Sequence, residues 1–173
     1  MQSTALENQN VGMSEVRKDN WAAGKLYEPY VGRWSRLVAK EFLQWLQLPA
    51  QLDWLDVGCG TGALTQAILQ QTQPQSVTGI DPSAGFIDYA KAQITDPRVT
   101  FEVADAQSLP VQSARFDVAV SGLVLNFVPK PLLAAQEMAR AVRPGGVVAA
   151  YVWDYAGKME LRRYFWDAAV TVD

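Results

Sequence analysis

A glycine-rich turn offers the clearest chemistry in this sequence. It follows a short β-prone run and carries glycine at positions 58, 60 and 62, with Ala63 opening a helical pattern. Because glycine has no Cβ atom, the backbone N–H groups of such a turn can approach a nucleotide-like ligand closely. Gly58, Gly60 and Ala63 also fit the G-x-G-x-x-G/A fingerprint of dinucleotide sites. The spacing predicts a nucleotide-like ligand and leaves its identity open; a glycine turn that only packs against a sheet is the simpler alternative.

A second candidate ligand residue, Asp81, follows the next β-prone run, 23 residues after Gly58. A carboxylate at the end of a strand can accept hydrogen bonds from both hydroxyls of a ribose. The alternative is that Asp81 caps the helix that begins beside Pro82. Together with the glycine turn, the first interpretation places an adenosine-type ligand across the ends of two neighbouring strands.

The elements that would position these residues alternate along the chain. Helices are expected at 63–71, 84–93 and 131–142, and β-strands at 52–57, 76–80, 99–103, 116–120 and 147–152. This alternation is typical of βαβ units, which give parallel strands with helices on both faces of the sheet. Ser83 is the expected cap of the second helix, and Pro144-Gly145-Gly146 is expected to precede the last strand. In such sheets ligands bind beyond the carboxyl ends of the strands.

The length of 173 residues favours a single domain with three segments. The first dozen residues are rich in Gln, Asn, Ser and Thr, and residues 1–20 are expected to form a mobile tail. Residues 21–50 are expected to be a helical lead-in that covers the site, and residues 51–173 the ligand-binding domain. Apolar side chains recur at helical spacing in the lead-in at Leu37, Val38, Phe42, Trp45, Leu46 and Leu48.

Composition excludes several kinds of function. The chain has no histidine and one cysteine, Cys59, which rules out Ser-His-Asp and Cys-His nucleophiles and predicts no metal site. Cys59 is interpreted as a small buried residue and not as a nucleophile. Fifteen basic against eighteen acidic residues, with no basic tract, predict no nucleic-acid partner. No apolar run approaches the roughly 20 residues of a membrane helix, so the expected location is cytoplasmic, with no membrane partner.

Five motifs in order along the chain resemble those of the class I S-adenosylmethionine-dependent methyltransferases. They lie at 56–62, 79–83, 104–106, 116–121 and 133–146. The resemblance implies an α/β fold: a doubly wound, Rossmann-like, mostly parallel sheet in three α/β/α layers. It also implies that the cofactor is S-adenosylmethionine and that the methyl acceptor is a small molecule.

The resemblance also implies a role for each motif residue. Gly58, Gly60 and Gly62 would pass beneath the methionine and ribose portions of the cofactor, and Asp81 would hold the ribose. Asp105 would accept from the adenine amino group, while Ala106 would offer its backbone N–H to a ring nitrogen. Asp56 would order the loop or contact the methionine ammonium indirectly. The full set expected to bind the cofactor is Asp56, Gly58, Cys59, Gly60, Gly62, Asp81, Pro82, Asp105, Ala106, Ser121 and Arg33.

Residues that would face the methyl acceptor lie in two places. In the lead-in, Tyr30 would face the sulfonium, and Arg33 would pair with the methionine carboxylate or an anionic substrate. The alternative is that Tyr27, Tyr30 and Trp34 form the packing face of a helix and that Arg33 is a solvated charge.

The second place is the carboxyl ends of the last two strands. There Asn126 would lie near the transferred methyl, and Trp153 would wall an apolar or aromatic acceptor. Asp154 is a candidate base, as are Tyr30, Tyr151 and Tyr155. The residues Leu123, Val124, Leu125 and Phe127 are interpreted as core.

The sequence departs from the family pattern after its fifth strand. Members usually continue into a further strand pair, so the domain is expected to be C-terminally incomplete, with an uncovered sheet edge that favours a homodimer. Three functions stay open: a small-molecule methyltransferase, an S-adenosylmethionine-binding module without activity, and an NAD-dependent oxidoreductase. The last would leave Asp105 and the helical lead-in unexplained.

Overall fold

A parallel five-stranded sheet forms the centre of the computed structural model, which describes residues 33–155, 159–160, 164, 167–168 and 170. The strands are β1 (Asp53–Val57), β2 (Ser76–Asp81), β3 (Val99–Val103), β4 (Phe116–Gly122) and β5 (Val142–Tyr151). Their order in the sheet is β3-β2-β1-β4-β5. All neighbouring pairs are parallel. The doubly wound α/β fold expected from the sequence is confirmed.

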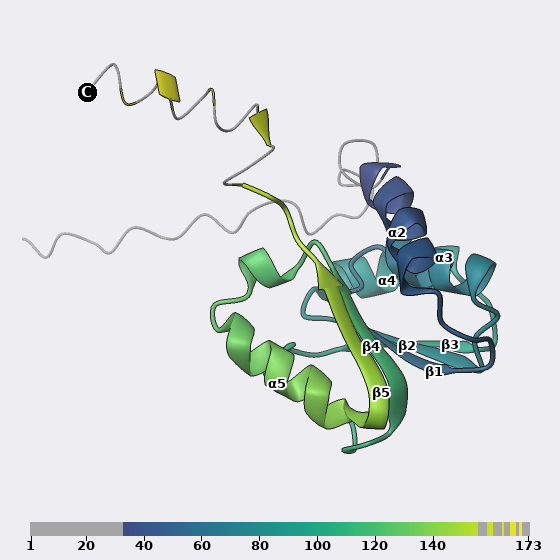
Figure 1. Ribbon diagram of the computed structural model, residues 1–173. Helices are drawn as coiled ribbons and strands as arrows, with labels where there is room; N and C mark the ends of the chain where they lie inside the picture. Colours follow the sequence, from purple (N-terminus) through teal and green to yellow (C-terminus); the bar gives the residue numbers. More distant parts are fainter. Residues whose placement is uncertain (1–32, 156–158, 161–163, 165–166, 169, 171–173) are drawn as a thin grey trace, which may run out of the picture.

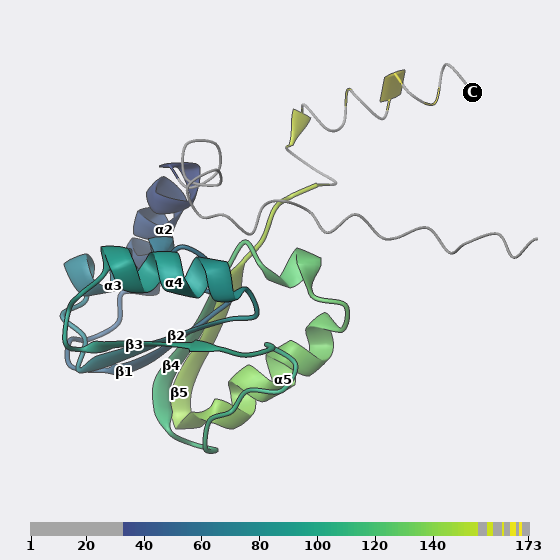
Figure 2. The same cartoon turned by 180° about the vertical axis from the view of Figure 1, so that it is seen from behind.

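Helices cover both faces of the sheet, as Figures 1 and 2 show. On one face lie α2 (Arg33–Leu46), α3 (Ala63–Gln71) and α4 (Ala84–Gln93), and on the other lies α5 (Pro131–Ala141). Each face has its own apolar core. Trp54, Val77 and Val118 pack toward α2 and α3, whereas Leu55, Val57 and Ala119 pack toward α5.

Central strands buried on both faces carry nearly continuous apolar runs. Four of the five residues of β1 are buried, as are five of the seven residues of β4. The chain runs outward from β1 through β2 to β3, and then returns to place β4 on the opposite side of β1. The switch point, where a crevice opens at the carboxyl ends of the strands, therefore lies between β1 and β4.

Local signals in the sequence predicted most helix boundaries. The helices at 63–71 and 84–93 have the expected bounds, and Ser83 caps α4 by accepting from the Phe86 N–H at 3.4 Å. Pro131 is the first residue of α5, where its missing N–H costs no hydrogen bond. None of the helices in the described residues has the length and apolar character of a membrane span.

The boundary expected for the last strand was wrong. Pro144-Gly145-Gly146 does not precede β5 but lies within it, because β5 begins at Val142. The register jumps from Phe116–Val142 to Val118–Val147, so the extra residues form a bulge. Gly145 has a φ of 81°, which favours glycine. The sequence pattern of a turn thus marks an irregularity in the strand.

Only some of the apolar residues that recur at helical spacing in α2 are buried in the core. Ala39, Phe42 and Leu43 are buried against the sheet and α3, as the helical spacing predicted for Phe42. Leu37, Val38 and Trp45 are exposed, Trp45 to 72%, together with Trp34. The expected lead-in residues before Arg33, Tyr27 and Tyr30 included, lie outside the described residues, as does the tail at 1–20.

Strands β3 and β5 form the two edges of the sheet in the described part of the chain. On β5 the side chain of Val148 is exposed, and so is Val103 on β3. Association of two copies through the β5 edge, expected from the sequence, stays a prediction.

Candidate nucleotide and acceptor site

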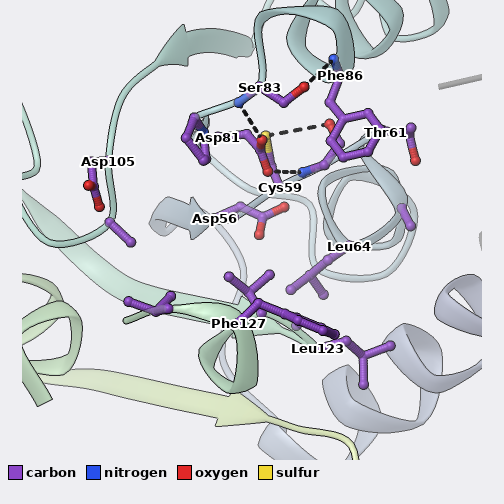
Figure 3. Close-up of a pocket in the computed structure, with 18 of the residues that line it drawn as sticks. Asp56, Cys59, Thr61, Leu64, Asp81, Ser83, Phe86, Asp105, Leu123 and Phe127 are labelled. Atoms are coloured by element: carbon purple, nitrogen blue, oxygen red, sulfur yellow. Dashed lines mark hydrogen bonds between the residues drawn. The ribbon is translucent and has the colours of Figure 1, made fainter. Parts of the chain in front are cut away.

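A cavity of about 460 Å³ opens at the switch point between β1 and β4. Figure 3 shows its walls: Asp81, Ser83 and Phe86 lie on one side, and Leu123 and Phe127 on the other. The residues that follow β1, β2, β3 and β4 contribute to it, together with Tyr151 at the end of β5 and Ser35 of α2. The lining residues are Ser35, Asp56, Gly58, Cys59, Gly60, Thr61, Ala63, Leu64, Asp81, Pro82, Ser83, Phe86, Ala104, Asp105, Ala106, Gln107, Gly122, Leu123, Val124, Phe127, Val128, Pro129 and Tyr151.

The glycine turn is fixed on the end of β2. The Gly58 and Cys59 N–H groups both donate to the Ile80 carbonyl, at 2.7 and 3.0 Å. Gly58 has a φ of 76°, and a Cβ there would lie 2.5 Å from the Val124 side chain. Gly60 has a φ of 53°, yet no atom lies within 4 Å of the place its Cβ would occupy. Gly58 is therefore required by packing, whereas Gly60 leaves open space beside the backbone.

Asp81 links the end of β2 to both neighbouring loops. Its Oδ2 accepts from the Gly60 N–H at 3.0 Å, and its Oδ1 accepts from the Ser83 N–H at 2.9 Å. Burial raises the pKa of this carboxyl above its usual value, and the two N–H donors oppose that rise. Each carboxylate oxygen has two acceptor positions, so one on each remains for a ligand hydroxyl. The N-cap of α4 is Ser83 and not Asp81.

Asp56 is the most deeply buried carboxyl of the site, with 1% of its surface exposed. The Thr65 hydroxyl of α3 donates to its Oδ2 at 2.6 Å, whereas Oδ1 has no hydrogen-bond partner in the described structure. Burial is the main reason that its pKa rises from 3.8 to about 7, and the charge of Asp81 raises it further. A buried acceptor without a partner at a cavity wall is an unsatisfied position for a donor or a cation.

Cys59 is buried at the turn, with 5% of its surface exposed. Burial raises the pKa of its thiol well above its usual value, and the nearby carboxyls of Asp56 and Asp81 add to the effect. A thiol with a raised pKa holds its proton and is a poor nucleophile. These values support the interpretation of Cys59 as a small buried residue.

The loop after β3 forms the far end of the cavity. Asp81 pairs with Val103 across the sheet, and the Ala104 N–H donates to the Asp81 carbonyl at 3.2 Å, which brings Asp105 to the same edge. Asp105 is exposed, and N–H donors of Gln107 lower the pKa of its carboxyl. Ala106 is buried beside it. This end can therefore offer a carboxylate acceptor to a ligand amino group.

The opposite end of the cavity is apolar. Leu123, Val124 and Phe127 follow β4, and the Tyr151 ring lies over Gly122, whose Cβ would come within 2.5 Å of the Tyr151 hydroxyl. The expectation that Leu123, Val124, Leu125 and Phe127 are core was wrong for Phe127, which is 67% exposed at the cavity. Leu123 has a φ of 61°, a backbone conformation that non-glycine residues adopt rarely.

Two of the residues expected to be catalytic do not line the cavity. The Asn126 amide pairs with the backbone of Trp153 instead: the Trp153 N–H donates to Oδ1 at 3.1 Å, and Nδ2 donates to the carbonyl at 3.4 Å. Asp154 is exposed beyond this pair. The third residue, Tyr30, lies outside the described residues.

Two of the residues expected to bind the cofactor do not line the cavity. Ser121 is buried and donates to the Val57 carbonyl at 2.8 Å, and Gly62 is the N-cap of α3, packed against Ile94. Arg33 is the first residue of α2, but its side chain is not described. The other eight, Asp56, Gly58, Cys59, Gly60, Asp81, Pro82, Asp105 and Ala106, line the cavity.

Several lining residues were not predicted as site residues. Phe86, Gln107 and Ser35 belong to α4, the loop after β3 and α2 respectively. Only the position of Phe86, three residues after the cap Ser83, gave a usable signal, because the first turn of a helix at a strand end faces the switch point. The described residues contain no cluster of histidine, cysteine and carboxylates that could hold a metal ion.

Comparison with known proteins gives consistent matches. Residues 55–150 match a family model described as a methyltransferase domain. Malonyl-[acyl-carrier protein] O-methyltransferase of Hahella chejuensis is 31% identical over 82% of this chain and 50% of its own length. The 2-methyl-6-phytyl-1,4-hydroquinone methyltransferase of Synechocystis sp. is 31% identical over 88% of this chain and 54% of its own. The chain thus spans about half the length of these curated relatives.

A solved structure shares the fold. A SAM-dependent methyltransferase from Aquifex aeolicus superposes with a TM-score of 0.66 over 78% of this chain and 73% of its own, at 19% identity. At this identity the likeness concerns the arrangement of the elements alone.

Proposed function

This chain belongs to the methyltransferase-domain family, and on that premise we propose that it binds S-adenosylmethionine and transfers a methyl group to a small organic acceptor. The observation that carries the proposal is the pair of Asp81 and the glycine turn. Asp81 holds the turn open through Gly60 and keeps acceptor positions free on both oxygens. This arrangement matches the two hydroxyl donors of a ribose.

The donor and acceptor groups of the cavity fit the remaining parts of the cofactor. Asp105 offers a carboxylate to the amino group of adenine, with Ala106 beside it. The Oδ1 atom of Asp56, which has no partner in the described structure, suits a site that takes a cationic ligand. The open space beside Gly60 allows the ligand to contact the backbone. When bound, the cofactor would supply a methyl group activated by a positively charged sulfur.

The protein's contribution would be to orient the acceptor and exclude water, because an activated methyl needs alignment more than acid–base help. Leu123, Val124 and Phe127 provide an apolar wall, and Tyr151 provides a hydroxyl. Among the described residues at this end, none is charged. We therefore favour an acceptor that presents an apolar ring or chain next to the atom that is methylated.

The relatives suggest what such an acceptor looks like. One is named for a hydroquinone with a phytyl chain and the other for a malonyl group on a carrier protein. Each name combines a small group, a malonyl group or a hydroquinone, with a larger part, a carrier protein or a phytyl chain. The nicotinamide-dependent alternative has no support from these matches, and it gives Asp105 no role.

Titration of the protein with S-adenosylhomocysteine tests the proposal. We expect one saturable site with a dissociation constant of roughly micromolar to sub-millimolar size, the usual range for enzyme ligands. NADH at the same concentrations should give no binding heat. Calorimetric heat with NADH and none with S-adenosylhomocysteine, on folded protein, would reverse the assignment. Transfer of a labelled methyl to isoprenoid hydroquinones or acyl carboxylates then tests the activity itself.

A further inference from the structure

The side chain of Gln107 joins two walls of the cavity. It lies in the loop after β3, and its Nε2 donates to both carboxylate oxygens of Asp105, at 3.1 Å each. Its backbone N–H donates to Asp105 Oδ1 at 2.8 Å. On its other side, Gln107 Oε1 accepts from the Lys130 N–H at 3.1 Å.

Lys130 is the N-cap residue of α5 and follows the segment that carries Phe127, Val128 and Pro129 of the cavity lining. The Gln107 amide thus bridges the carboxylate end and the apolar end of one cavity. Because the Lys130 N–H belongs to the first turn of a helix, it has no partner within that helix. The Gln107 Oε1 atom accepts from this N–H, so the amide points its oxygen toward Lys130 and its NH2 group toward Asp105.

On the basis of the proposed function, we propose that Gln107 is a positioning residue that orients Asp105 for the adenine amino group and links it to the acceptor wall through Lys130. The amide can do both, because it has a donor for the carboxylate and an acceptor for the N–H. A carboxylate at position 107 would repel Asp105 and keep the Lys130 contact, whereas an aliphatic side chain would lose both.

A second set of contacts, further along the same loop, attaches the loop to α5 independently of Gln107. Glu137 of α5 accepts from the Leu109 N–H at 2.9 Å, and Arg140 donates to the carbonyls of Leu109 and Val111 at 3.0 and 2.8 Å. These contacts fix residues 109–111 to α5. Removal of the Gln107 side chain should therefore disturb Asp105 without releasing the whole loop.

The test compares Gln107→Leu and Gln107→Glu with the parent protein and with Gln93→Leu, an exposed glutamine at the end of α4. Each is titrated with S-adenosylhomocysteine and with S-inosylhomocysteine, in which a carbonyl replaces the amino group. The parent and Gln93→Leu should prefer the adenine compound. Both Gln107 variants should lose about tenfold of that preference, the usual size of one hydrogen bond to a charged group, at an unchanged urea midpoint.

A second readout does not depend on the nucleotide preference. Binding of S-adenosylhomocysteine should slow hydrogen exchange of the Lys130 amide in the parent and in Gln107→Glu, and not in Gln107→Leu. An unchanged preference in both variants, or equal protection of Lys130 in Gln107→Leu, would overturn the proposal while the proposed function stands. If the parent itself binds neither compound, the proposed function fails, and this inference fails with it. If the urea midpoint falls for Gln107→Leu but not for Gln107→Glu, the nucleotide preference of Gln107→Glu decides the test.

Discussion

Replacement of Asp81 by asparagine is expected to weaken binding of S-adenosylhomocysteine by at least about 100-fold, since hydrogen bonds to a charged acceptor contribute about 1.5 to 3 kcal/mol each. The carboxylate has one acceptor position on each oxygen beyond those used by Gly60 and Ser83. In the asparagine variant an NH2 group replaces one of these oxygens. Because each oxygen accepts from a backbone N–H, of Gly60 or of Ser83, either orientation of the amide places two donors against each other and removes an acceptor position for the ribose.

Calorimetric titration measures this effect, with Asp88→Asn as the matched control. Asp88 lies on the exposed face of α4, one turn after the loop that Asp81 holds. The control should bind as the parent does. Equal affinity of Asp81→Asn and the parent would remove Asp81 from the ribose position, and the proposed function would lose its main support. A urea unfolding curve for each variant separates lost binding from lost folding.

The fold could be predicted from the sequence because its signals are local. Short β-prone runs mark β1 and β4, which are buried on both faces, and Ser83 and Pro131 mark the starts of α4 and α5. The bulge in β5 could not be predicted in this way. A Pro-Gly-Gly sequence is typical of a turn, and only the pairing with β4 across the sheet makes it part of a strand.

The same distinction between local signals and contacts distant in sequence applies to the candidate site. Asp81 and Asp105 could be placed because Asp81 ends β2 and Asp105 comes two residues after β3, and the sheet brings strand ends together. Asn126 could not be placed, because its amide direction depends on the Trp153 backbone, 27 residues away in sequence. Gln107 was missed for a similar reason: its two partners, Asp105 and Lys130, lie in different loops. Contacts of this kind leave no periodicity in the sequence.

The pH dependence of stability should be dominated by the buried carboxyl of Asp56, whose pKa rises from 3.8 to about 7 on folding. Between these values the folded chain holds a proton that the unfolded chain has lost. The favourable contribution is complete below about pH 4 and is lost as pH rises through about 7. Its size is about 4 kcal/mol, from 1.36 kcal/mol for each unit of pKa. Asp81 acts in the same direction, because its pKa is also raised.

Comparison with Asp56→Asn isolates this contribution, because the amide cannot ionise and its oxygen can still accept from Thr65. Urea unfolding at pH 4.5, 6 and 8 gives the free energy of unfolding of both proteins. Relative to the parent, the variant should gain about 3 kcal/mol in free energy of unfolding between pH 4.5 and 8, because about 1 kcal/mol of the total is already lost at pH 4.5. Asp81 and Cys59, the titratable groups that interact with Asp56, are present in both proteins, so their own titration largely cancels in the difference. A difference that stays constant with pH would mean that Asp56 is ionised in the folded protein at pH 4.5, and its unpartnered oxygen would then need a donor that the described residues do not supply.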